Sequence, residues 1–555
     1  MISEICLSDL IKKAGRTYPG PLTPLDREIV ECAQILSAFL LRTKKLGGPH
    51  QHRVLAEFLG SGIGAESDLR EWIESRSDSP VSQRVWDSCR KRAESWLAEG
   101  ITVTAWKPSA IAGSDVTPCR SPCPAVLFAK GKFDPHLPRI AIFNSRKPRP
   151  VSPDSPWLKA LRTVPGDIAS SGVGLATGLG TLTYDMTGTF AVRSALPLTV
   201  AAPCSVLKPN SEFSRLYGKA EGGIALLSCL LDTSACTKTK RLLCRDRILA
   251  ELADIHIVLE IRSGGNLATV LREQQRRSPR LHVVYEPEKR NSTNSANFDL
   301  LREFPAHARA VRIRKSEGPP ELLGIPCPEP AISTLEPDRI DWNSYLFHYT
   351  RACPGPWPGQ TYSQYLLSLL DGDPLSGHSA FDTLTRILEE GLIRAGSGMV
   401  RGSEAVISWS SHPPSDLFRL RKWNPALVRW TVEPYGLAFR RDFLRSVGAK
   451  PAVYGREEVY SSLPATEKHR FQLSRSRVSD WRHEREWRLR GDLNIMNAGE
   501  ENFFVFVQTE RERRFLELHE TRIPVIALES SGLENSARGT RGDESGCKKA
   551  KNSLS

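Results

Sequence analysis

Short runs of β-branched and other apolar residues alternate with helical segments through the middle of this 555-residue chain. Four such runs are Arg139–Phe143, Pro197–Ala201, Ile255–Glu260 and Leu281–Tyr285. Strands of a parallel sheet are covered on both faces, so they read as continuous apolar runs, and each helix returns the chain to the same edge. The alternation predicts an α/β fold with a Rossmann-like parallel sheet.

The chain before these runs is expected to be mainly helical. Apolar residues recur at helical spacing in Asp26–Thr43 and Val85–Leu97, the pattern of a helix with one buried face. The chain is also longer than one ordinary domain. We therefore expect a helical N-terminal region over residues 1–100 and the Rossmann-like domain over residues 101–290.

The chain after residue 290 changes texture twice. A polar run followed by a Pro-rich stretch predicts a linker over residues 291–341. Trp- and Arg-rich strands with one clear helix, Ala380–Gly391, then predict an α+β domain over residues 342–529. Residues 530–555 carry few apolar side chains and are expected to form a disordered tail.

Basic side chains outnumber acidic ones by 76 to 63, which gives a net charge of +13. This excess favours anionic partners such as nucleic acid, and it is equally compatible with a basic protein that lacks such a partner. The first residues do not form a secretory signal, and no uncharged apolar run approaches the ~20 residues needed to cross a bilayer. We expect a cytoplasmic protein with no membrane partner.

Twelve cysteines are scattered along the chain. Cys119 and Cys123 are the only closely spaced pair, and no second pair of ligands follows at the spacing of a zinc site. We expect reduced thiols and no metal site.

Small polar residues and an arginine follow the first predicted strand. Asn144, Ser145 and Arg146 come directly after Phe143, at the carboxyl edge where α/β sheets bind ligands. The Gly-rich run 170–178 is expected to form a turn that opens a helix, where backbone amides can approach a phosphate. A solvated loop arginine and an ordinary tight turn are the structural alternatives.

The order of these segments resembles that of the Smf/DprA family over about residues 30–290. Asn144-Ser-Arg146 is similar to the family's Gly-Ser-Arg. Other similar segments are Pro124–Gly131, Gly174–Gly178, Gly223–Ser228, Arg245–Asp254 and Arg262–Thr269. The resemblance implies a Rossmann-like fold, a single-stranded DNA or nucleotide ligand and a recombinase partner, and it leaves the oligomeric state open.

The resemblance also implies an anion site made of arginines, small residues and glycine amides. Its residues are Ser145, Arg146, Gly174, Gly178, Arg245, Arg247, Arg262, Ser263, Gly264 and Gly265. The chain departs from the family at Asn144, Thr177, Gly180, Cys229 and Asp246. Thr177 replaces an arginine that would contact a phosphate, and Asp246 is expected to repel one. The alternative is a scaffold that only presents the other domain.

Strand-like segments in the C-terminal region carry polar residues at alternating positions. In Leu346–Thr350, His348 lies on the face opposite Phe347 and Tyr349. In Asp480–Leu489, two carboxylates, Glu484 and Glu486, share one face. Paired carboxylates and a histidine are groups that hold a nicotinamide ribose and stabilise an oxocarbenium-like centre, which is the chemistry of ADP-ribosyl transfer.

Residues 343–528 resemble DarT-like ADP-ribosyltransferases and uncharacterised phage-defence domains in their His-Tyr-Thr start and late Glu-x-Glu-Trp-Arg. The resemblance implies NAD as cofactor and gives each residue a role. His348 would orient the ribose, Ser410 would support its strand, and Glu486 would be the catalytic carboxylate with Glu484 beside it. A cross-strand ladder of ion pairs and a structural histidine are the alternatives.

The sequence thus leaves three hypotheses of function. The first is a DprA-like protein that binds single-stranded DNA or a nucleotide, with a C-terminal effector domain, in DNA uptake or phage defence. The second is an ADP-ribosyltransferase or NAD-consuming effector gated by the middle domain. The third is a scaffold without catalytic activity.

Overall fold

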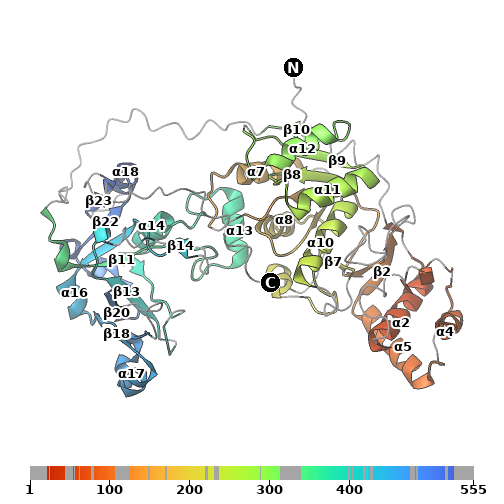
Figure 1. The fold of residues 1–555 in the computed structure, drawn as a ribbon, viewed down its shortest axis with the longest axis horizontal. Helices are drawn as coiled ribbons and strands as arrows, with labels where there is room; N and C mark the ends of the chain where they lie inside the picture. Colours follow the sequence, from red (N-terminus) through yellow and green to blue (C-terminus); the bar gives the residue numbers. More distant parts are fainter. Residues whose placement is uncertain are drawn as a thin grey trace, which may run out of the picture. The chain divides into compact units, whose positions relative to one another are not determined.

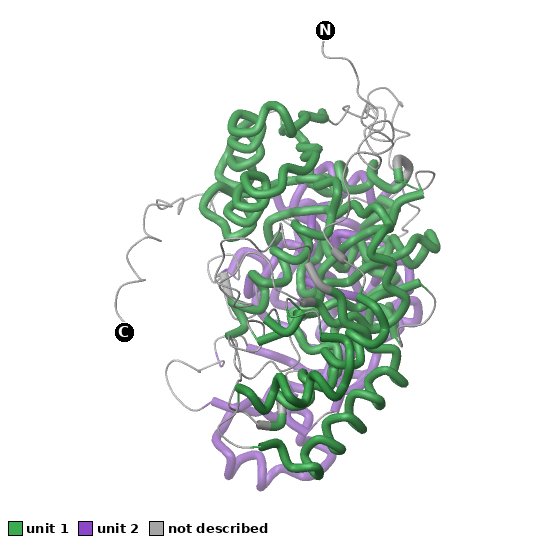
Figure 2. The backbone as a smooth tube through the Cα atoms, turned by 90° about the vertical axis from the view of Figure 1, so that its right-hand side faces the viewer, with its two compact units in different colours: residues 1–148, 153–317, 358–374 green, residues 149–152, 318–357, 375–555 purple. Residues whose placement is uncertain are grey.

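The computed structural model divides into two compact units (Figures 1 and 2). Unit 1 comprises residues 1–148, 153–317 and 358–374, and unit 2 comprises residues 149–152, 318–357 and 375–555. The residues described are 22–529 except 24, 44–53, 56, 60, 62, 77–79, 107–125, 148–149, 169–171, 210, 219–222, 230–236, 288, 313–338, 398–399, 403, 417–420, 422, 425–428, 475–481, 483–484 and 519–522. The Cys119–Cys123 pair and the expected tail lie outside them. Within these residues, no helix has both the length and the apolar character needed to cross a membrane.

Unit 1 is built on a ten-stranded sheet whose main part is parallel. The parallel strands lie in the order β7-β6-β5-β4-β8-β9-β10. They are β4 (Arg139–Phe143), β5 (Gly174–Thr177), β6 (Leu198–Ala201), β7 (Ile224–Ser228), β8 (Ile255–Val258), β9 (Leu281–Tyr285) and β10 (Ala308–Val311). The chain runs outward from β4 to β7 and then crosses back to β8 on the other side of β4, so the strand order reverses between β4 and β8. The expected Rossmann-like α/β fold is confirmed.

One helix follows each of the first six parallel strands. They are α7 (Pro156–Ile168), α8 (Leu182–Arg193), α9 (Ser211–Tyr217), α10 (Lys238–Leu252), α11 (Asn266–Arg277) and α12 (Ser295–Glu303). Side chains from both faces of the sheet are buried: every residue of β4, β5, β6, β7 and β8 lies in the interior. Strands and helices together form one apolar core around residues such as Phe143, Leu227 and Leu271.

The N-terminal region is helical, as expected, and it also extends the sheet. Its helices are α2 (Arg27–Thr43), α4 (Glu66–Glu74) and α5 (Gln83–Ala98), and its strands are β1 (Leu22–Thr23), β2 (Ile101–Trp106) and β3 (Val126–Lys130). These strands are antiparallel, and β3 joins them to β7. Ile101 and Val103 of β2 are buried while Thr102 is exposed, the alternation of a strand with one covered face.

The expected linker over residues 291–341 is corrected by the structure for its first part, because α12 and β10 lie within it. The side chain of Asn297 explains why a polar segment is buried here. Its amide nitrogen donates to the carbonyls of Leu259 (2.5 Å) and Tyr285 (2.7 Å), and its amide oxygen accepts from the backbone of Ile261 at 2.9 Å. A polar side chain with all its hydrogen bonds made is compatible with a core position.

Residues 358–374 also differ from expectation, because they belong to unit 1 and not to the C-terminal domain. Their helix α13 (Tyr362–Asp371) packs against α7, α8 and α9 through a buried apolar face. The Tyr362 hydroxyl donates to the buried Asp185 carboxylate at 2.8 Å, and Arg193 forms an ion pair with Asp371 at 2.6 Å. Helix α13 is therefore part of the Rossmann-like unit.

Unit 2 is the α+β unit predicted from the sequence, built on a seven-stranded sheet ordered β17-β20-β13-β11-β16-β22-β23. The strands are β11 (Tyr345–Tyr349), β13 (Val406–Ser410), β16 (Gly436–Arg440), β17 (Lys450–Pro451), β20 (Glu486–Arg490), β22 (Phe503–Val507) and β23 (Val525–Ala527). Three two-stranded sheets pair β12 (Leu392–Ile393) with β21 (Leu493–Asn494), β14 (Trp423–Asn424) with β15 (Arg429–Trp430), and β18 (Val453–Gly455) with β19 (Phe471–Leu473).

The predicted helix of unit 2 is α14 (Ala380–Glu390), and it ends where the sequence indicates. Gly391 adopts φ 63°, the left-handed conformation that glycine tolerates best at a helix end. Shorter helices that the sequence did not reveal are α16 (Arg441–Ser446), α17 (Glu457–Ser462) and α18 (Glu510–Leu518). Apolar clusters around Trp409 on one face of the sheet and Phe347 on the other hold unit 2 together.

Candidate functional site

The carboxyl ends of β4 and β8 meet where the strand order of unit 1 reverses. The backbone amide of Ser145 donates to the Glu260 carbonyl at 2.9 Å, and the amide of Arg262 donates to the Ser145 hydroxyl at 3.2 Å. These bonds tie the two strand ends together. A reversal of strand order is the place where open α/β sheets bind ligands, so we take this carboxyl edge of unit 1 as the candidate site.

Two predicted arginines of the carboxyl edge are exposed and unpaired. Arg146 follows β4 and Arg262 follows β8, and both side chains reach solvent. Neither makes an ion pair or a side-chain hydrogen bond to any described residue. Guanidinium groups without an internal partner keep all their N–H donors for an external anion.

A lysine and a glutamate lie beside these arginines and neutralise each other. Lys147 is paired with Glu260, and their side chains are only 9% and 12% exposed. Burial lowers the pKa of Lys147 below its ordinary value, while the Glu260 ion pair opposes the shift. The pair therefore contributes little net charge to the edge, which leaves Arg146 and Arg262 as its cationic groups.

The Gly-rich segment differs from the turn expected from the sequence. Gly174 begins strand β5, and a Cβ atom there would lie 2.7 Å from the Leu137 side chain. Gly178 follows β5, and a Cβ atom there would lie 2.8 Å from Arg245 and 2.9 Å from Tyr184. The two glycines serve close packing, and the Gly174 amide already donates to the Pro138 carbonyl at 2.9 Å.

Arg245 and Arg247 are already paired inside unit 1. Arg245 is 4% exposed, and its guanidinium forms hydrogen bonds to Asp246 at 2.7 and 2.9 Å. Asp246 also accepts the Tyr184 hydroxyl at 3.0 Å, so this carboxylate, which we expected to repel a phosphate, is an internal partner. Arg247 pairs with Glu273 at 3.3 Å. Both arginines hold α10 in place and are not available to an anion.

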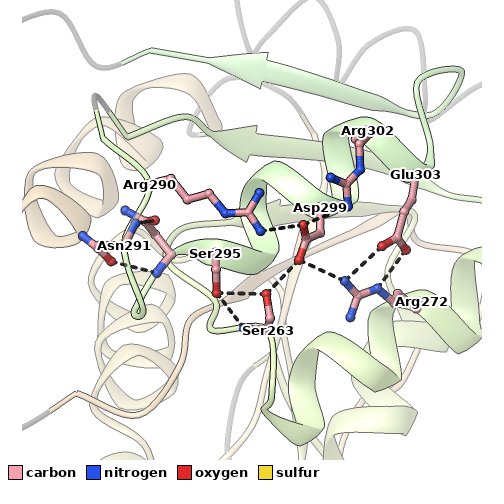
Figure 3. Close-up of polar contacts among 9 residues, drawn as sticks. Ser263, Arg272, Arg290, Asn291, Ser295, Asp299, Arg302 and Glu303 are labelled. Atoms are coloured by element: carbon pink, nitrogen blue, oxygen red, sulfur yellow. Dashed lines mark hydrogen bonds and ion pairs between the residues drawn. The ribbon is translucent and has the colours of Figure 1, made fainter.

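The loop after β8 contains the remaining predicted residues. The Ser263 amide donates to the Ser295 hydroxyl at 3.0 Å, and its own hydroxyl donates to Asp299 at 2.7 Å (Figure 3). Gly264 is exposed, with no atom within 4 Å of a Cβ built on it. Gly265 is the N-cap of α11 and has no capping side chain. The Gly265 amide donates to the Arg262 carbonyl at 3.3 Å, so the backbone of this loop is open to a ligand at Gly264.

The polar residues of unit 2 lie on different faces of its sheet. In the sheet register, Ser410 is paired with Phe347 on one side and with Glu486 on the other, so these three side chains share a face. His348 follows Phe347 and lies on the opposite face, where its ring contacts Trp409 at 5.4 Å between centroids. The structure therefore brings Ser410 and Glu486 to one face and places His348 on the other. Glu484 lies outside the described residues.

His348 fills a gap between two strands. A single residue pair joins β11 to β13, and the His348 Nδ1 atom lies 3.0 Å from the Ser408 carbonyl. A carbonyl only accepts, so Nδ1 carries the proton and Nε2 is the acceptor of the neutral ring. Burial lowers the pKa of His348 to about 4, which keeps the ring neutral at pH 7.

Glu486 is surrounded by donors from its own unit. Its carboxylate accepts the Ser408 hydroxyl at 2.7 Å and forms two hydrogen bonds of 3.0 Å with Arg488. The Glu486 and Arg488 side chains are 11% and 3% exposed. Both oxygens of the carboxylate accept hydrogen bonds. The ion pair joins two residues of β20, so it differs from the cross-strand ladder that was the structural alternative.

Comparison with known proteins gives two similar solved structures. DNA processing protein A from Streptococcus pneumoniae has 13% identity and a TM-score of 0.32, over 56% of this chain and 95% of that one. DNA processing protein A from Helicobacter pylori, whose structure concerns its binding of single-stranded DNA, has 18% identity and a TM-score of 0.29, over 38% of this chain and 90% of that one. No family model and no curated protein matches the chain. The Rossmann-like assignment of unit 1 rests on its strand order.

Two residues of these regions were missed by the sequence analysis. Asn144 is 4% exposed at the end of β4, where its amide donates to Thr183 at 3.0 Å and its Oδ1 atom has no partner in the described structure. Its position directly after a predicted strand could have marked Asn144 as a candidate site residue. It was instead named only as a difference from the Gly-Ser-Arg motif. The second is Ser408, whose hydroxyl donates to the Glu486 carboxylate at 2.7 Å. The register of β13 against β20 brings Ser408 there, and the sequence alone does not give that register.

Proposed function

We propose that the carboxyl edge of unit 1 binds the phosphates of single-stranded nucleic acid. The observation that carries the proposal is that Arg146 and Arg262, at the point where the strand order reverses, are exposed and have no ion-pair partner among the described residues. The open backbone at Gly264 and the net charge of +13 support it. Recognition through arginines and backbone amides depends on phosphate charge, so binding should tolerate any sequence and weaken with salt.

The edge supports binding more than it supports catalysis. Lys147 and Glu260, the acid–base pair closest to the arginines in sequence, are buried and paired with each other. Neither is free to exchange a proton with a ligand. We therefore assign the edge a binding role, with the effector function of unit 2 left to experiment.

The test is binding of a labelled oligothymidylate to the full chain and to an Arg146→Gln, Arg262→Gln double variant. We expect affinity to fall roughly tenfold or more per arginine, since a hydrogen bond to a charged group contributes about 1.5–3 kcal/mol. The control is Arg27→Gln with Arg90→Gln, two exposed arginines of α2 and α5 that carry the same charge. Equal binding by the edge variant and the control would refute the proposal.

A further inference from the structure

Three arginines converge on one buried carboxylate beside the carboxyl edge. Asp299 of α12 accepts hydrogen bonds from Arg290 at 2.9 Å, Arg302 at 3.2 Å and Arg272 at 3.4 Å. The Asp299 side chain is 9% exposed. Figure 3 shows this carboxylate between the guanidinium groups, with Ser263 beneath it. We call these four charged residues the Asp299 cluster.

The three guanidinium groups of the Asp299 cluster have more N–H donors than the Asp299 carboxylate can accept. Arg272 is also bound to Glu303, at 2.8 and 3.1 Å. Arg290 and Arg302 each make one side-chain hydrogen bond among the described residues, both to Asp299. A guanidinium has five N–H donors, and these side chains are 49% and 70% exposed. Most of their donors therefore face solvent.

Asp299 also connects the arginines to the loop that carries Arg262. The Ser263 hydroxyl donates to Asp299 at 2.7 Å, and Ser263 directly follows Arg262. Burial acts to raise the pKa of Asp299, but the Ser263 hydrogen bond and the arginines outweigh it and hold the pKa below its ordinary value. The carboxylate thus stays charged at neutral pH and fixes both the loop and the arginines.

We infer that Arg290 and Arg302, held by Asp299, form a second phosphate subsite next to Arg146 and Arg262. The ligand is then a strand with several phosphates, because one phosphate cannot occupy two separate arginine pairs. Asp299 is a positioning residue: it restrains two flexible cations before a phosphate arrives, which lowers the entropy lost on binding. This inference rests on the function proposed for the carboxyl edge and specifies the length of its ligand.

The first experiment compares an Arg290→Gln, Arg302→Gln variant with the wild-type chain and with the Arg27→Gln, Arg90→Gln control. The probes are thymidine monophosphate and an oligothymidylate of about 20 nucleotides, longer than the ~4–16 nucleotides that single-strand binders commonly cover. We expect the variant to bind the oligonucleotide about tenfold more weakly and the monophosphate unchanged. The slope of log affinity against log salt should become shallower by about 1.4, or ~0.7 per lost contact.

The outcomes separate the two proposals. Loss of binding in the Arg146, Arg262 variant, with wild-type affinity and salt slope in the Arg290, Arg302 variant, overturns the second subsite and leaves the first. Failure of the wild-type chain to bind the oligonucleotide at low salt overturns both. Equal weakening of monophosphate and oligonucleotide by Arg290→Gln, Arg302→Gln would show one shared site, which also overturns the second subsite.

Asp299→Asn gives a test with an opposite sign. The substitution removes one negative charge, so simple charge attraction predicts tighter binding of the oligonucleotide. The positioning role predicts weaker binding, because Arg290, Arg302 and the Ser263 loop lose their common anchor. Thermal unfolding of the variant checks that unit 1 remains folded, and tighter binding by a folded variant would exclude the positioning role.

Discussion

The carboxyl edge of unit 1 and the group formed by Ser408, Glu486 and Arg488 in unit 2 look alike in sequence and differ in structure. Each has charged residues at or beside strands. At the edge, Arg146 and Arg262 are exposed, and no residue in the described part of the chain pairs with them. In unit 2, the Glu486 carboxylate is enclosed by Arg488 and Ser408. An unpaired exposed charge is available to a ligand, whereas an enclosed ion pair contributes to the architecture of its own unit.

The largest expected effect on stability is that of replacing Glu486. Glu486→Ala would leave the buried Arg488 without its carboxylate, and breaking a buried pair costs about 3–5 kcal/mol. We expect a large decrease in the thermal stability of unit 2, measured by calorimetry. The exposed pair of Arg445 and Asp442 provides the control, since Asp442→Ala should change stability by less than about 1 kcal/mol.

A Glu486→Gln variant tests the transferase hypothesis for unit 2. If the wild-type chain consumes NAD and a folded Glu486→Gln variant does not, the carboxylate is catalytic and the contrast between the two regions fails. Equal NAD turnover in both proteins, or none in either, agrees with an architectural role for Glu486.

Buried histidines extend the comparison to pH. In unit 1, His256 of β8 and His282 of β9 are fully buried with ring nitrogens 3.0 Å apart. Burial lowers the pKa of His282 from 6.5 to about 3 and also lowers that of His256. In unit 2, burial lowers the pKa of His348 to about 4 and also lowers that of His469. Near pH 6.5 these histidines therefore bind protons in the unfolded chain but stay neutral in the folded units.

Acid should therefore destabilise both units. A base with a lowered folded-state pKa stabilises above its unfolded pKa, and this stability decreases as pH falls from about 6.5 toward 3, by at most about 1.4 kcal/mol per pH unit for each histidine. Thermal unfolding of the full chain, measured at several pH values, would show this loss of stability as the pH falls. His282→Gln should flatten the dependence for unit 1, and an unchanged slope would contradict this account.

The smallest expected effect concerns the stability of the edge variants. Arg146→Gln and Arg262→Gln remove exposed side chains without partners, so each should change the free energy of unfolding by less than about 0.5 kcal/mol. Urea denaturation measures this change. A larger loss would mean that the arginines support the fold, and the contrast with Glu486 would disappear.

The sequence by itself determined the features that depend on local pattern. Apolar runs such as Arg139–Phe143 became buried parallel strands, and Arg146 was correctly expected at the carboxyl edge of the sheet. Gly391 ended α14 as predicted, because a glycine after an amphipathic run favours the left-handed conformation there. Hydrophobic periodicity and helix-ending residues depend on a few neighbouring positions, so a single sequence is enough to predict them.

Only the tertiary structure decided which charges are free. Arg245 and Arg262 were both expected in one anion site, yet Arg245 is buried against Asp246 and Tyr184 while Arg262 faces solvent. Helix α13 joins unit 1 through Tyr362 and Asp185, which are 177 positions apart. Such pairings follow from the packing of distant segments, so local sequence patterns do not predict them.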